Sequence, residues 1–183
     1  MALITNAVKP LEALEVRPFL ADVIFHEVKN HTSQASGKTS WACDMEILGP
    51  NTVQSVDGQE VIVAGQKMKS YASLDTEKEW GAGSIIRGLE LAGFDFSKFT
   101  GNDSGAPALD PDQPEAVRGL NCRMMVSLRK EPLTELQADG SYAEIKGPDD
   151  KVIIKRAGWA PLAMNPFAAI KSAPVVTVDT GGM

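Results

Sequence analysis

The chain has 183 residues, a net formal charge of −6 and hydrophobic residues at 43% of its positions, which predicts one globular domain and excludes a wholly disordered chain. The acidic balance excludes a protein that coats nucleic acid merely by being basic. No run approaches the roughly 18 apolar residues that cross a bilayer, and the first residues lack the pattern of a secretion signal, so we expect a cytoplasmic protein that has no membrane association.

The N-terminal third predicts two strands joined by a polar loop. Residues 1–15 are expected to be a loosely ordered lead-in, and residues 16–29 (VRPFLADVIFHEVK) have the β-branched and aromatic content of a strand that is apolar on both faces. Residues 30–39 are polar and contain glycine, which indicates a loop. In residues 41–48 (WACDMEIL), Trp41 alternates with core residues, so we expect it in the core or at the mouth of a barrel.

Residues 61–72 (VIVAGQKMKSYA) predict a third strand with two different faces. One face would carry Ile62, Ala64 and Met68, and the other would carry Val61, Val63, Lys67, Lys69 and Tyr71.

The segment EWGAGSIIRGLELAGFD, residues 79–95, contains the Gly81-Ala82-Gly83 spacing of a phosphate-binding loop. Ile86 stands where a dinucleotide fingerprint has its third glycine, and no Walker lysine follows. Apolar residues instead recur at helical spacing, with capping residues at 73–76 and Gly93 in the position of a C-terminal cap. We therefore predict a helix whose glycines permit tight packing against a sheet, and keep a nucleotide-handling enzyme as a third hypothesis.

The rest of the chain predicts an acidic connector and two further strands. Residues 100–116 are rich in turn residues and acids, and residues 118–130 (RGLNCRMMVSLRK) alternate as a fourth strand with Arg123 and Arg129 on one face. Hairpin arms around Asp139-Gly140 and residues 147–150 precede a closing strand at residues 151–157. Residues 159–183 are expected to be a C-terminal extension with a flexible tail.

This order of elements predicts a mainly β fold. Residues 16–158 would form a five-stranded Greek-key barrel of the oligonucleotide/oligosaccharide-binding (OB) type, with one α-helix between strands 3 and 4. The strand-loop-strand FLADVIFHEVKNHTSQASGKTSWACDMEIL and the later RGLNCRMMVSLRK strand resemble single-stranded DNA-binding proteins of bacteriophages. The resemblance implies sequence-independent binding and protection of single-stranded DNA during replication, recombination or repair, with replication or recombination proteins as further partners.

Binding of this kind requires cations along the phosphates and aromatic faces on which bases stack. Asp44 and Glu46 count against it, since they would repel phosphate unless they pair with Lys67 or Lys69 across the ladder. Taken singly, each basic residue is better explained as part of a solvated sheet face. Taken together, the arginine strand and the Lys/Tyr strand fit either explanation. The candidate residues are Lys38, Lys67, Lys69, Tyr71, Arg123, Arg129, Lys151, Lys155 and Arg156, with Phe25 as a candidate stacking residue.

The sequence predicts no catalytic or metal site. Cys43 and Cys122 lie far apart without Cys or His companions, which indicates buried thiols, and the histidines His26 and His31 belong to no catalytic motif. We expect no enzyme activity, no cofactor and no metal. The alternative hypothesis is a non-enzymatic β-rich structural or assembly protein of a virion, a homo-oligomer whose sheet faces pack against other subunits.

Overall fold

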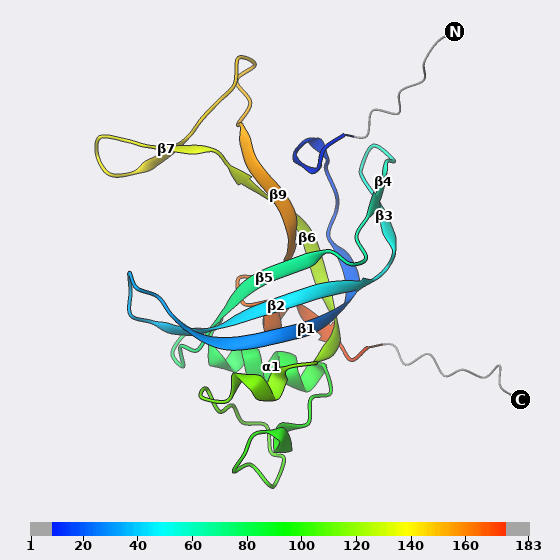
Figure 1. Cartoon of the computed structure of the whole chain (residues 1–183), viewed down its shortest axis with the longest axis vertical. Coiled ribbons are helices and arrows are strands. Elements are labelled where there is room, and N and C mark those ends of the chain that lie inside the picture. The colour runs from blue at the N-terminus through cyan, green and yellow to red at the C-terminus, as the bar shows by residue number, and fades with distance from the viewer. Residues whose placement is uncertain (1–8, 175–183) are drawn as a thin grey trace, which may run out of the picture.

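A curved antiparallel sheet forms the body of the protein (Figure 1). The computed structural model describes residues 9–174. The strands lie in the order β10-β6-β1-β2-β5, and β9 pairs with the second half of β6. Their bounds are β1 (Phe19–Thr32), β2 (Thr39–Gly49), β5 (Lys67–Ser73), β6 (Asn121–Pro132), β9 (Ile154–Pro161) and β10 (Ile170–Ser172).

The predicted mainly β fold is confirmed, but the sheet does not close into a barrel within residues 9–174. The strands β5 and β9 approach each other, yet no hydrogen-bonded ladder joins them there. The reason is an offset along β6: its residues 121–126 pair with β1, whereas its residues 126–132 pair with β9. The strand β9 therefore follows the part of β6 that extends past β1, and it reaches β5 without joining it.

The predicted helix lies between the third and fourth long strands, as α1 (Ala82–Leu91), and covers the lower end of the sheet in Figure 1. Gly93 follows it with φ of 73°, in the left-handed conformation expected of a C-terminal cap. The predicted side-chain cap at the N-terminus is absent, because Gly81 is the N-cap. A β carbon on Gly88 would lie 2.3 Å from the carbonyl oxygen of Phe167, so this glycine permits close packing against the short helix η4 (Pro166–Ala169) rather than against the sheet.

The predicted third strand is broken into two elements. Its first part is β4 (Glu60–Ile62), which pairs with β3 (Thr52–Gln54) in a separate small sheet. Gly65, with φ of 85°, turns the chain before β5 begins. The turn shifts the alternation of side chains, so that Val61 and Val63 are buried whereas Lys67 is exposed. The expectation that all three share one face was wrong.

The core lies between the sheet and α1. It includes residues that follow residue 158, where the predicted domain ends. Trp159, Phe167 and Ile170, which fall in the predicted C-terminal extension, are all buried in the same cluster as the long strands. In the predicted lead-in, η1 (Leu11–Ala13) precedes the buried Leu14. The other short helices are η2 (Phe96–Lys98) and η3 (Pro114–Val117). The predicted flexible tail at residues 175–183 lies outside the described residues.

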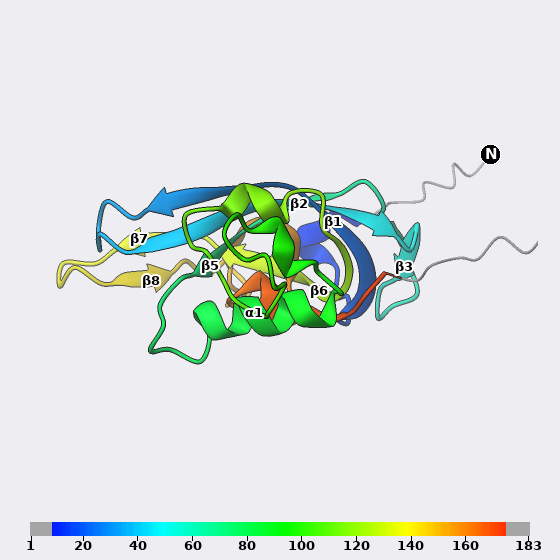
Figure 2. The same cartoon turned by 90° about the horizontal axis from the view of Figure 1, so that it is seen from below.

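A two-stranded ribbon projects from the body, formed by β7 (Thr134–Leu136) and β8 (Tyr142–Glu144) (Figures 1 and 2). It confirms the hairpin predicted around Asp139-Gly140. Figure 2 shows that the ribbon and the loop between β1 and β2 extend toward the same side of the molecule. Within residues 9–174, no helix is long and apolar enough to cross a membrane.

Candidate nucleic-acid interface

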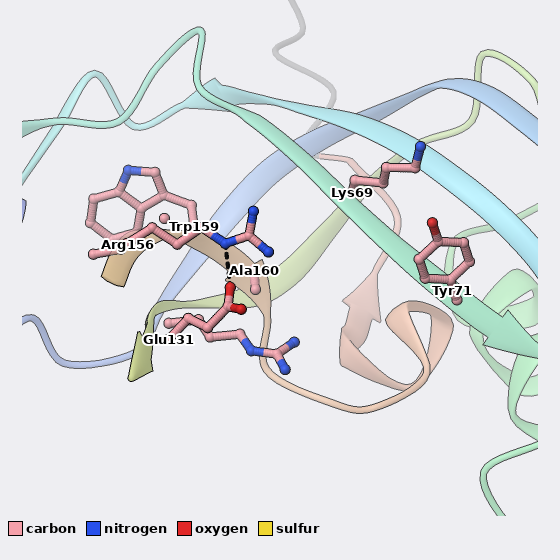
Figure 3. Close-up of a pocket in the computed structure, with 9 residues that line it drawn as sticks. Lys69, Tyr71, Glu131, Arg156, Trp159 and Ala160 are labelled. Atoms are coloured by element: carbon pink, nitrogen blue, oxygen red, sulfur yellow. Dashed lines mark hydrogen bonds and ion pairs between the residues drawn. The ribbon is translucent and has the colours of Figure 1, made fainter. Parts of the chain in front are cut away.

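A cleft of about 520 Å³ lies where β5 approaches β9 and the second half of β6. Figure 3 shows Lys69 and Tyr71 on one side of it, and Glu131, Arg156 and Trp159 on the other. The backbone of residues 157–160 completes the wall that β9 contributes. The side chains that line the cleft are Lys69, Tyr71, Arg129, Glu131, Arg156 and Trp159.

Strand alternation places these side chains at the cleft. On β5, Met68 and Ala72 point into the core, so Lys69 and Tyr71 must point outward. On β6, the buried positions end at Val126, and Arg129 and Glu131 continue the outward series beyond the pairing with β1. The cleft therefore joins the exposed faces of strands that are far apart in the sequence.

The charges that line the cleft are three cations and one carboxylate. The carboxylate of Glu131 is paired with the Nε of Arg156, and this hydrogen bond lowers the pKa of Glu131. Lys69 and Arg129 form no ion pair with any residue in the 9–174 range. Two unpaired cations therefore face the cleft from opposite walls.

The cleft also has two aromatic side chains. Tyr71 is 46% exposed, and the ring of His31 lies 4.9 Å from its ring at a tilt of 46°. Trp159 is only 6% exposed and packs edge-on against Phe19, with 5.7 Å between the ring centroids. The buried Nε1 of Trp159 has no hydrogen-bond partner among the described residues. Tyr71 thus offers a ring face to a ligand, and Trp159 forms a firm apolar wall.

Lys67 stands in a neighbouring groove, where its charge is already compensated. Its ammonium group pairs with the carboxylate of Glu46, and the Nε2 of His26 lies 3.0 Å from the same carboxylate oxygen. The hydrogen bond from Lys67, and then that from His26, lower the pKa of Glu46. The predicted cross-strand pairing of Glu46 with Lys67 is confirmed. Asp44 lies opposite Lys69 in the ladder, but no ion pair joins them.

Several predicted residues lie away from the cleft. Arg123 is 3.6 Å from a carboxylate oxygen of Asp22 on the neighbouring strand, and Lys38 lines a separate shallow groove beside Ser73. Lys151 and Lys155 are exposed but do not line the cleft.

Phe25 cannot serve as a stacking residue, which corrects the prediction. Its side chain is fully buried, and its ring stacks on that of Phe167 with 5.1 Å between centroids. The first strand is apolar on both faces, so alternation alone did not show which side faces the core. The sequence reasoning also missed Glu131, His31 and Trp159. Alternation gave no signal for Trp159, because it places Arg156 and Trp159, three residues apart, on opposite faces of a strand.

The described residues contain no group of three or more His, Cys, Asp or Glu side chains that could hold a metal ion. Comparison with protein-family models gives no match, and comparison with curated proteins also gives none. The functional interpretation therefore depends on the geometry and chemistry of the cleft.

Proposed function

We propose that the protein binds single-stranded DNA, without sequence specificity, in the cleft between β5 and β9. The observation that carries the proposal is that unpaired cations from β5 and β6 and the exposed ring of Tyr71 line one cleft, although β5 and β6 are not neighbours in the sheet. A solvated sheet face explains Lys69 or Arg129 taken alone. It does not explain why they meet across a cleft that also exposes Tyr71.

Each element of the cleft matches a part of a single strand. Lys69 and Arg129 can contact successive phosphates, because they approach from opposite walls and neither forms an ion pair with a carboxylate of residues 9–174. The exposed ring of Tyr71 can stack on a base, an interaction worth about 1 to 3 kcal/mol per base in other proteins. Bases within a duplex already stack on each other and are not free to do this. The cleft should therefore prefer single strands.

The arrangement of strands supports the same proposal. We infer a fold of the OB type that is open between its third and fifth long strands, with α1 between the third and fourth. In folds of this type, loops beside the sheet frame the ligand. The loop between β1 and β2 and the β7–β8 ribbon both extend on one side of the molecule (Figure 2). They would lengthen the path of a bound strand beyond the cleft itself.

A titration of labelled oligothymidine with the full chain tests the proposal. Fluorescence anisotropy at about 50 mM and about 200 mM salt should show binding that weakens steeply as salt rises. A duplex of the same length should bind more weakly. Equal affinity for oligothymidine and the duplex, or no salt-dependent binding of either ligand, would refute the proposal. A large defined oligomer without any affinity for oligothymidine would instead favour a structural protein.

A further inference from the structure

The β7–β8 ribbon carries two apolar side chains that no described residue covers. Leu136 and Tyr142 are 65% and 72% exposed, and they lie directly opposite each other in the ladder. Glu144 is two residues from Tyr142 along the same strand, so its side chain shares this face. A two-stranded ribbon is marginally stable by itself in water, and this ribbon leaves its largest apolar pair in solvent. The two side chains form one small exposed apolar patch that another molecule could cover.

The ribbon has a firm base and points away from the body. Three backbone hydrogen bonds join residues 133, 145 and 153: Leu133 donates to Ile153 at 2.8 Å, Ile145 to Leu133 at 2.8 Å, and Ile153 to Ile145 at 2.9 Å. This junction adjoins the end of β6 and the start of β9 (Figure 1). The ribbon is therefore held away from its own body, which makes its exposed face available to another molecule.

Charge identifies the surface that the ribbon fits. Residues 133–145 contain Glu135, Asp139 and Glu144 but no lysine or arginine. Two ribbons packed face to face would bring like charges together, which is unfavourable. The cleft instead presents Lys69 and Arg129 unpaired, beside aromatic side chains that can pack against a tyrosine and a leucine. Opposite charge and apolar contact therefore both favour the cleft as the docking surface.

We propose that the β7–β8 ribbon of one copy docks in the cleft of a second copy. The contact uses two different surfaces, so it is heterologous, and each docked pair of copies leaves one ribbon and one cleft free. Association should therefore be open-ended, should increase with protein concentration and should weaken with salt. This inference goes beyond the proposed function and does not require the cleft to bind DNA.

Two variants of the full chain test the contact by sedimentation velocity at low salt. The ribbon variant carries Leu136→Ser and Tyr142→Ser, and the cleft variant carries Lys69→Ala and Arg129→Ala. The wild-type chain should form a concentration-dependent series of species, and each variant alone should remain a monomer. An equal mixture of the two should form a dimer and nothing larger, because only one ribbon and one cleft of the pair remain competent.

The same experiment can overturn the inference. It fails if the wild-type chain remains a single species at all concentrations, or if the mixed variants form no complex. The substituted residues are exposed, and a thermal unfolding curve checks that both variants fold. A second ribbon variant, Glu144→Lys, retains the apolar pair and should still lose association at low salt; unchanged association would show that the contact is not with the cationic cleft.

Titration of the wild-type chain with oligothymidine distinguishes the two proposals. Association that the mixed variants reproduce supports the ribbon contact whether or not oligothymidine binds. Oligothymidine binding by a chain that never associates overturns the ribbon contact and leaves the proposed function intact. If both proposals hold, oligothymidine should disperse the association, because it occupies the same cleft.

Discussion

Removal of the two unpaired cations of the cleft should change both the affinity for a single strand and its dependence on salt. The variant Lys69→Ala with Arg129→Ala deletes two charges that have no ion-pair partner in residues 9–174. Each cation that contacts a phosphate of a single strand contributes about 0.7 to the slope of log affinity against log salt, so the pair contributes about 1.4.

This slope predicts specific losses. If the electrostatic contribution vanishes near 1 M salt, a slope of about 1.4 corresponds to a loss of about 70-fold at about 50 mM and about tenfold at about 200 mM. Both side chains are exposed, so we expect the free energy of unfolding to change by less than about 0.5 kcal/mol. The loss should therefore reflect binding and not a damaged fold.

Anisotropy titration of labelled oligothymidine at several salt concentrations measures both quantities. Lys171→Ala is the matched control, because Lys171 is exposed on β10 and does not line the cleft. It should change the slope by less than the double variant does. A double variant whose slope equals that of the wild-type chain would refute the assignment of phosphate contacts to these two residues.

Three further substitutions or measurements test other parts of the structure. Gly158→Ala should preserve oligothymidine binding, because a β carbon at this position meets nothing within 4 Å. Gly158→Glu should weaken binding, because it places a carboxylate in the cleft that repels phosphate. Equal titration curves for the two variants would contradict this. In urea denaturation, Gly88→Ala should lower the free energy of unfolding by about 1 to 3 kcal/mol, whereas Gly83→Ala, which has open space, should raise it by up to about 1 kcal/mol. Burial raises the pKa of Cys43 and Cys122 to about 12. A thiol reagent at about pH 8 should therefore label neither cysteine until the chain is denatured. Rapid labelling of the native chain would show that the core is open.

Alternation along single strands was the most informative part of the sequence. It predicted that Lys69 and Tyr71 share one face of their strand, because Met68 and Ala72 flank them on the other face. It placed Arg129 opposite the apolar series that ends with Val126 and Leu128. The helical spacing of apolar residues likewise predicted the helix between these strands, and Gly93 predicted its end. These features depend on local periodicity, which a sequence records directly.

The approach of β9 to β5 could not be predicted in this way. The approach depends on the offset of β9 along β6. Because β9 and β5 do not pair with each other, no residue pattern encodes their relative position. The break at Gly65 was missed because the apolar pattern continues across it, although a glycine inside a strand pattern is a signal for such a break. Trp159 was missed because the predicted domain ended one residue before it.

Crosslinking tests most directly whether a single strand lies in the cleft. Oligothymidine that contains a photoreactive thymidine analogue is irradiated in complex with the full chain, and the crosslinked peptides are identified by mass spectrometry. We predict crosslinks at Tyr71 on β5, whose ring is exposed in the cleft, and in the β9 peptide that forms the opposite wall. Crosslinks confined to the groove at Lys38 or to the face that carries Arg123, with both cleft peptides unmodified, would contradict the account.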